Sequence, residues 1–352
     1  MKGYVVLENG DVFEGTIHHY DEATSGELVF FTGATGHEKI LTDPATKGQI
    51  IVFTQPLIGT CGIDEFQANS RIYANGFIAH DVANESFHYE AVMSLSAFSK
   101  RERVPFMTNV DTRALVKRIR EHGEMKAVIT LHPEDVSFEE KADVFSRRAE
   151  APKTYGDGES HIVVIDYGFH PSFVSELVEC GHKVTVVPHN ISLKSLASLR
   201  PHTVIVSNGP GRPFLNENEE KTLRAIATTY PTIGIGLGHQ LIALAFGAKI
   251  DTLKCGHRGI SQPVIDVETN RVVMTMQNHR YVIDEKSLDE TGFQVKFKNV
   301  HDRSIEGLVH RELPIVTMQF HPLAALGPAD TKPYFLSTLQ LLLSKGREKV
   351  YA

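Results

Sequence analysis

This sequence lacks the residues on which several classes of protein depend. It contains no tryptophan, and its three cysteines, Cys61, Cys180 and Cys255, are scattered singly among 352 residues. Such spacing provides neither a disulfide framework nor a zinc site, and it is typical of a reducing compartment. We therefore expect no structural metal and a cytoplasmic location.

Long apolar runs and clusters of basic residues are also missing. No apolar stretch approaches the length of a membrane span, and the formal net charge is −7. The first residues, MKGYVVLENGDVFEG, alternate like a strand and carry acidic side chains, unlike a secretory signal peptide. A negative chain without basic runs is a poor partner for nucleic acid or an anionic membrane. We expect neither as a partner.

The chain length suggests two domains, and the rhythm of the sequence changes once along it. Residues 1–146 contain short strand candidates at 4–7, 28–31 and 49–53, separated by Gly, Asn and Asp turns, and a helical pattern over 111–122. Residues 147–160 are polar, contain a proline and two glycines and show no apolar period. We predict a β-rich α+β domain over 1–146 and a linker over 147–160.

From residue 161 onward, apolar strands and helical stretches alternate. HIVVIDYG, KVTVVPHN, TVIVSNGPG and TIGIG have the pattern of buried strands, and SFVSELVECG that of a helix closed by Gly181. Such alternation predicts an α/β domain over 161–352, with a doubly wound, mostly parallel sheet covered by helices on both faces. After residue 250 the pattern becomes more β-like, and residues 334–345 are predicted to form a closing helix.

The stretch PTIGIGLGHQLIALAFG, residues 231–247, organises this second domain. It predicts a buried strand, a glycine-punctuated turn and an apolar helix, the arrangement that brings nucleophiles and ligands to the edge of an α/β sheet. One interpretation is a dinucleotide fingerprint. Its spacing fails, because the third glycine of G-x-G-x-x-G would fall on His239.

The other interpretation is a nucleophile elbow, and it carries a resemblance to a known family. GIGLGHQ, residues 234–240, resembles the G-I-C-L-G-H-Q elbow of class I glutamine amidotransferases. The N-terminal half adds stretches particular to the small subunit of carbamoyl-phosphate synthetase, and the sequence is identified as a member of that family. The matching stretches run in order over nearly the whole chain: GATGHEKILTDPATKGQIIVFTQPLIGTCGI (33–63), DTRAL (111–115), DYG (166–168), SNGPG (207–211), GHRG (256–259), QNH (277–279) and MQFHPLAALGPAD (318–330).

The resemblance implies a division of labour between two subunits. The small subunit hydrolyses L-glutamine and passes ammonia to a large subunit, which uses ATP, Mg and bicarbonate to make carbamoyl phosphate for arginine or pyrimidine biosynthesis. This chain has no G-x-x-x-x-G-K-[ST] motif, since GATG at 33–36 is followed by His37. We therefore expect no cofactor on this chain, ATP and Mg on the large subunit, and a heterodimer with that subunit.

The residues that catalyse glutamine hydrolysis in the family are only partly present. There, a cysteine thiolate attacks the amide, a histidine moves the proton, a glutamate orients the histidine and backbone amides hold the oxyanion. The resemblance places the base at His321, Gly236 at the nucleophile position and Leu323 at the glutamate position. Glycine has no attacking atom, and leucine cannot accept the imidazole N–H. The covalent route is therefore closed, and residue 323 fixes neither the tautomer nor the ring orientation of the base.

The same resemblance maps the glutamine-contacting positions of the family onto this chain. Ala45 replaces a serine, Arg280 stands where the family has glycine, and Arg212 nearby replaces an acid. Considered alone, the glycines among the retained positions are better explained as ordinary turn residues. The retained positions are Gly209, Gly211, Leu237, Gln240, Asn278 and Tyr281.

Several changes that converge on one pocket indicate that it is no longer maintained for glutaminase chemistry. Glycine tolerates the strained backbone of an elbow, so we expect the fold and the elbow to persist in a pseudoenzyme that serves as a structural or regulatory subunit. Three alternatives stay open. They are a module that has left the synthetase and binds an anionic ligand through Arg212 and Arg280, a glutaminase with another nucleophile, and a dinucleotide-binding protein.

Overall fold

The computed structural model describes residues 1–138, 149–323 and 329–350. The chain divides into two compact units. The first unit comprises Met1–Val144 together with Lys254–Gly259, and the second comprises Phe145–Leu253 together with Ile260–Ala352. The boundary predicted between residues 146 and 147 lies outside the described residues. The return of a later segment, 254–259, to the first unit was not predicted from the sequence.

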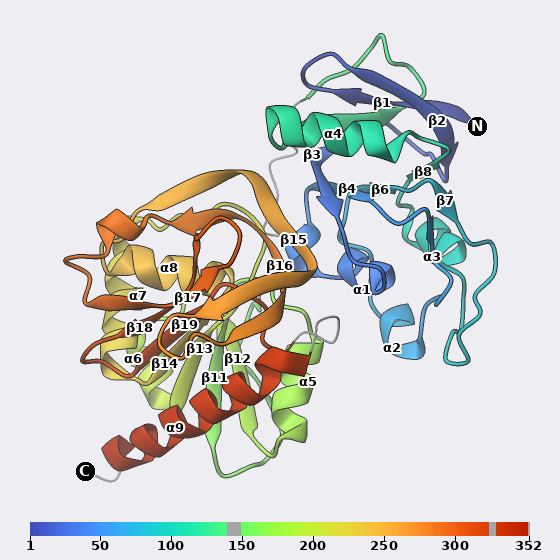
Figure 1. The fold of residues 1–352 in the computed structure, drawn as a ribbon. Coiled ribbons are helices and arrows are strands. Elements are labelled where there is room, and N and C mark those ends of the chain that lie inside the picture. Colours follow the sequence, from blue (N-terminus) through green and yellow to red (C-terminus); the bar gives the residue numbers. More distant parts are fainter. Residues whose placement is uncertain (139–148, 324–328, 351–352) are drawn as a thin grey trace. The chain divides into compact units, whose positions relative to one another are not determined.

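The first unit is built around a closed β-barrel (Figure 1). Its strand order is β1-β2-β8-β6-β4-β3-β9, and alternate apolar side chains such as Val5, Leu28 and Ile50 fill a buried core. The strands predicted over 4–7, 28–31 and 49–53 are confirmed as parts of β1, β3 and β4. The barrel strands are β1 (Lys2–Leu7), β2 (Val12–His18), β3 (Thr24–Phe31), β4 (Gln49–Phe53), β6 (Gly76–Ile78), β8 (Phe106–Thr108) and β9 (Met125–Thr130).

The helices of the first unit are short, and α4 (Thr112–His122) shows why one begins where it does. Asp111 is its N-cap, with its side chain accepting a hydrogen bond from the Ala114 N–H at 2.9 Å. Leu115 and Ile119 are buried on one face, which confirms the helix predicted over 111–122. The remaining elements are α1 (His37–Leu41), a 3-10 turn (Pro44–Thr46), α2 (Glu65–Ala68), α3 (Leu95–Glu102) and the strand pair β5 (Leu57–Ile58) and β7 (Asp81–Val82).

The second unit contains one twisted sheet with the strand order β10-β12-β11-β13-β14-β19-β18-β17-β15-β16. The pairings from β12 through β19 are parallel, whereas β10, β18 and β17 pair antiparallel with their neighbours. This arrangement confirms the predicted α/β class. The strands are β10 (Lys153–Tyr155), β11 (His161–Asp166), β12 (Lys183–Pro188), β13 (Thr203–Val206), β14 (Thr232–Ile235), β15 (Ile250–Asp266), β16 (Val272–Ile283), β17 (Phe293–Asn299), β18 (Ile305–His310) and β19 (Ile315–Met318).

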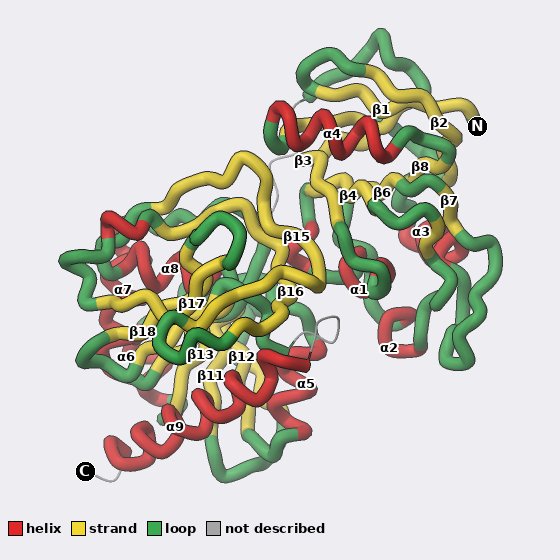
Figure 2. Tube along the Cα trace, viewed as in Figure 1, coloured by secondary structure: helices red, strands yellow, loops and turns green. Residues whose placement is uncertain are grey.

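Helices cover both faces of this sheet (Figure 2). Helices α6 (Leu193–Ser198), α7 (Glu217–Thr229) and α8 (Leu237–Ala245) share one apolar cluster, while α5 (Ser172–Glu179) and α9 (Lys332–Val350) share the other. Strand β10 lies within the segment predicted as a linker, so that part of the prediction is wrong. The strand was missed because an exposed edge strand is held by backbone pairing and needs no apolar period. No helix of the described ranges is long and apolar enough to cross a bilayer.

Candidate functional site

The predicted elbow is present where β14 ends and α8 begins. Gly236 joins them with φ 55° and ψ −113°, a backbone conformation that a residue with a side chain adopts only under strain. Its N–H donates to the Met318 carbonyl of the neighbouring β19 at 2.9 Å. All residues from 231 to 240 are buried. The sequence therefore forms the sharp strand-to-helix turn with glycine at its centre.

The space beside Gly236 is filled by the side chain of Asn208, which follows β13 in the sheet. A Cβ built on Gly236 would overlap the Asn208 Oδ1 and lie 2.8 Å from its Cγ. Asn208 Oδ1 accepts a hydrogen bond from the backbone N–H of Leu237 at 3.2 Å. Its Nδ2 lies 3.3 Å from the Nε2 of His321. One carboxamide thus contacts both the first N–H of α8 and the candidate base.

His321 follows β19, and its backbone N–H donates to the Met276 carbonyl at 3.1 Å. Because the amide of Asn208 offers a donor to the ring, Nε2 must act as an acceptor, and the neutral ring then carries its proton on Nδ1. Leu323, two residues on, is 5% exposed and belongs to an apolar cluster with Phe320. The side chain that contacts the ring is that of Asn208, which was not predicted from the sequence.

The loop after β13 carries two of the predicted glutamine-contacting positions. A Cβ on Gly209 would overlap the carbonyl oxygen of Tyr167, so close backbone packing requires glycine there whatever its role in binding. Gly211 and Arg212 lie on the exposed part of the same loop. Asn208 belongs to the SNGPG motif at 207–211. Its contact with the elbow could have been predicted from its position, because it follows β13, the strand that pairs with the elbow strand β14.

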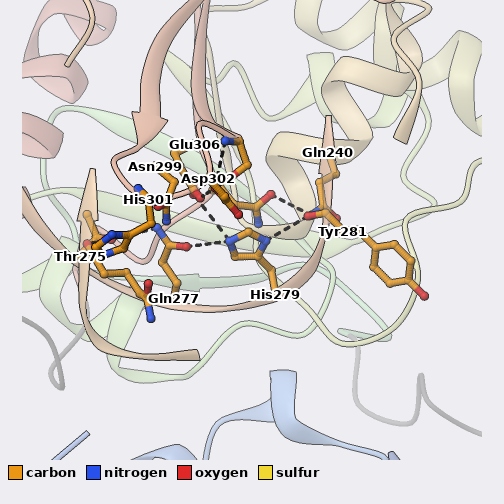
Figure 3. A network of polar contacts seen from close by, with 12 residues as sticks. Gln240, Thr275, Gln277, His279, Tyr281, Asn299, His301, Asp302 and Glu306 are labelled. Atoms are coloured by element: carbon orange, nitrogen blue, oxygen red, sulfur yellow. Dashed lines mark hydrogen bonds and ion pairs between the residues drawn. The ribbon is translucent and has the colours of Figure 1, made fainter. Parts of the chain in front are cut away.

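Gln240 of α8 and Tyr281 of β16 belong to one network of polar contacts (Figure 3). The Nε2 of Gln240 donates to the Tyr281 carbonyl at 2.7 Å and to the Gln319 Oε1 at 2.8 Å. The Nδ1 of His279 lies 3.0 Å from the same Tyr281 carbonyl. The structure thus ties the helix α8 to β16 through a polar network within the second unit.

The ring of His279 lies at the centre of this network (Figure 3). Its Nε2 lies 2.7 Å from the Gln277 Oε1 and 3.6 Å from the carboxylate of Glu306, whose side chain is fully buried. Both ring nitrogens face oxygen acceptors, and each donates only if it carries a proton. Sequence reasoning missed Glu306, because a single acid in a short strand gives no signal of the histidine opposite it.

Asn278, Arg280 and Ala45 are the remaining predicted positions. Asn278 on β16 has a buried Nδ2 with no hydrogen-bond partner among the described residues. The Nε of Arg280 donates to the Leu253 carbonyl at 3.4 Å. Ala45 is buried in the first unit, where its N–H donates to the Asp43 Oδ1 at 2.9 Å.

The burial of His239 on α8 predicts that the stability of the second unit depends on pH. Full burial lowers the pKa of His239 from 6.5 to about 3, against the opposing pull of Glu306 and with a further lowering by His279. The unfolded chain binds this proton below pH 6.5 and the folded chain only near pH 3, so stability is lost as the pH falls. Between pH 7 and pH 4.5 we expect a loss of about 2.5 kcal/mol from this group.

Urea unfolding at several pH values would measure this loss. The matched variant is His239→Asn, which keeps a polar group near Thr317 Oγ1, the present partner of His239 Nδ1 at 2.7 Å. We expect the decline in unfolding free energy between pH 7 and pH 4.5 to be smaller in the variant by about 2.5 kcal/mol. Identical declines in the two proteins would contradict a neutral, buried His239.

Known proteins match this chain over its whole length. Residues 163–341 match the family model "Glutamine amidotransferase class-I", and residues 5–129 match "Carbamoyl-phosphate synthase small chain, CPSase domain". The chain is 46% identical to a carbamoyl phosphate synthase arginine-specific small chain of Halalkalibacterium halodurans and 43% identical to that of Bacillus subtilis, with full coverage of both partners in each comparison. A carbamoyl phosphate synthase small chain of Caldanaerobacter subterraneus is 34% identical over all of this chain and 99% of its own. The described fold and these matches show that the chain belongs to the carbamoyl-phosphate synthase small chain family, with a class I glutamine amidotransferase domain in its C-terminal half.

Proposed function

We propose that this chain is the small subunit of a carbamoyl-phosphate synthase in which glutamine hydrolysis is lost, and that it supports a large subunit supplied with free ammonia. The observation that carries the proposal is at the elbow. Residue 236 has no side chain, and the Asn208 carboxamide occupies the space that a side chain there would need. The first atom of a nucleophilic side chain is therefore missing, and Asn208 occupies its place.

The rest of the pocket agrees with this loss. Leu323 is buried in an apolar cluster, where it offers no acceptor to His321. In the serine protease subtilisin, a site without its triad retains only roughly 10³–10⁴-fold acceleration over water. Uncatalysed amide hydrolysis is so slow that such a factor supplies no useful flux of ammonia. His321 and the N–H of Leu237 thus remain from a set of catalytic groups that lacks its nucleophile.

We assign the chain to arginine biosynthesis rather than pyrimidine biosynthesis. The two relatives at 46% and 43% identity are both named arginine-specific. Since no glycine-rich ATP motif is present in the sequence, ATP and Mg bind to the large subunit in this proposal. The partner of the chain in this proposal is that large subunit, and L-glutamine is not a substrate.

Reconstitution with the large subunit tests this proposal. Carbamoyl-phosphate synthesis is measured with ammonium or with L-glutamine as the only nitrogen donor. We expect synthesis with ammonium and none above background with glutamine, because no atom of residue 236 can attack the amide. The His321→Ala variant is the control, and it should leave ammonium-dependent synthesis unchanged.

Two other results would reject the proposal. Glutamine-dependent synthesis at a rate near the ammonium rate would show another nucleophile, particularly if His321→Ala abolished it. Failure to associate with the large subunit would favour the alternative of a binding module that has left the synthetase.

A further inference from the structure

The contacts of Asn208 match those that a substrate amide would make in an amidotransferase elbow. In this type of turn, the backbone N–H of the residue after the nucleophile belongs to the oxyanion hole, and that residue here is Leu237. Its N–H donates to the Asn208 Oδ1 at 3.2 Å. The amide oxygen of Asn208 thus takes the donor that would otherwise stabilise a developing oxyanion.

The nitrogen of the same carboxamide faces the candidate base. Asn208 Nδ2 lies 3.3 Å from His321 Nε2, the atom that would receive a proton from a nucleophile or return it to the leaving nitrogen. Asn208 is 9% exposed, so this contact is largely withdrawn from water. Both polar ends of the carboxamide are satisfied by the two groups that remain of the catalytic machinery.

The missing side chain of residue 236 makes this placement possible. A Cβ at Gly236 would overlap Oδ1 and lie 2.8 Å from Cγ and 3.2 Å from Cβ of Asn208. A residue with a side chain there would therefore displace the carboxamide. The loss at residue 236 and the position of Asn208 are two aspects of one arrangement.

We propose that the Asn208 carboxamide is an internal ligand of the amide subsite and holds it closed to a primary carboxamide such as the side chain of L-glutamine. This inference rests on the proposed function, because it takes the elbow as a former glutaminase site. It adds a specificity-determining residue and the class of ligand that it excludes. A free amide must displace Asn208 from Leu237 and His321 before it can bind, so removal of Asn208 should open the subsite.

The Leu237 amide is a direct reporter of this competition. The full chain, labelled with ¹⁵N, is titrated with acetamide as the smallest amide probe and with L-glutamine, and the Leu237 N–H resonance is followed. Asn208→Ala is the test variant, and Asn208→Ser replaces it if the alanine variant does not fold, since the shorter hydroxyl cannot reach both partners. Asn218→Ala, on the exposed surface of α7, is the control.

We expect the Leu237 resonance to shift on the Asn208 substitution itself. We also expect at least a roughly tenfold lower apparent Kd for an amide probe than in the unaltered chain, because two hydrogen bonds no longer need to be displaced. The control should behave as the unaltered chain. Equal affinities, no response in any variant, or an unchanged Leu237 resonance in Asn208→Ala would each overturn the proposal. The titration needs no large subunit, so its failure is distinguishable from a failure of the reconstitution experiment.

Discussion

Arg258→Ala is expected to lower the free energy of unfolding of the first unit by about 3–5 kcal/mol. The guanidinium of Arg258 contacts the carboxylate of Glu124, and their side chains are 5% and 1% exposed. The alanine variant removes this cation from a buried acid, and loss of the cationic partner of a buried carboxylate costs more than loss of a surface contact. The same carboxylate also accepts from the Gly256 N–H at 2.7 Å, so its position is fixed.

Urea unfolding followed by circular dichroism measures this effect, since the chain has no tryptophan to report by fluorescence. Arg118→Ala is the matched control. Arg118 pairs with Asp11 at 2.9 Å with the two side chains 42% and 34% exposed, and such surface pairs contribute at most about 1 kcal/mol. Adding Glu124→Gln to Arg258→Ala should recover part of the loss, because a neutral amide still accepts from Gly256. A loss in Arg258→Ala no larger than in the control would contradict the buried pair.

Leu323→Glu is expected to destabilise the second unit by at least about 3 kcal/mol. The leucine side chain is 5% exposed within an apolar cluster that includes Phe320 and Phe335. The substitution removes buried apolar area and places a carboxyl group among hydrocarbon side chains. Leu323→Met is the control, because an apolar exchange of similar volume typically costs less than about 1.5 kcal/mol.

Denaturant unfolding of both variants decides between two arrangements of residue 323. If Leu323→Glu is as stable as Leu323→Met, the carboxyl group has reached water or the ring of His321, and the packing described above is wrong for that variant. If the large loss is found, restoring the acid does not rebuild a glutaminase in one step. A variant with Gly236→Cys and Leu323→Glu would then require repacking around residue 323 and displacement of Asn208.

The parts of the fold that were predicted depend on local patterns. The apolar runs of β11, β13 and β14 each form a short buried strand, and the spacing of Leu115 and Ile119 indicates a helix after the cap Asp111. The turn at Gly236 was predicted because strand, glycine and helix follow one another directly. Such signals lie within a few residues of each other, so they remain readable without the tertiary structure.

The parts that were missed depend on contacts between distant segments. Asn208 is 113 residues from His321 in sequence, and its role is set by the space left at Gly236. The pairing of Glu306 with His279 likewise requires two strands to be placed side by side. Strand β10 was assigned to a linker because an exposed edge strand carries no apolar pattern. Composition and periodicity contain no information on these placements.

The membership of residues 254–259 in the first unit has a consequence for folding during synthesis on the ribosome. Glu124 is synthesised 134 residues before Arg258, the cation that it meets in the folded chain. The barrel strands through β9 therefore emerge long before the segment that neutralises their buried acid. Strands β11 to β14 are synthesised in the interval. The first unit is therefore complete only after most of the parallel strands of the second unit have been synthesised.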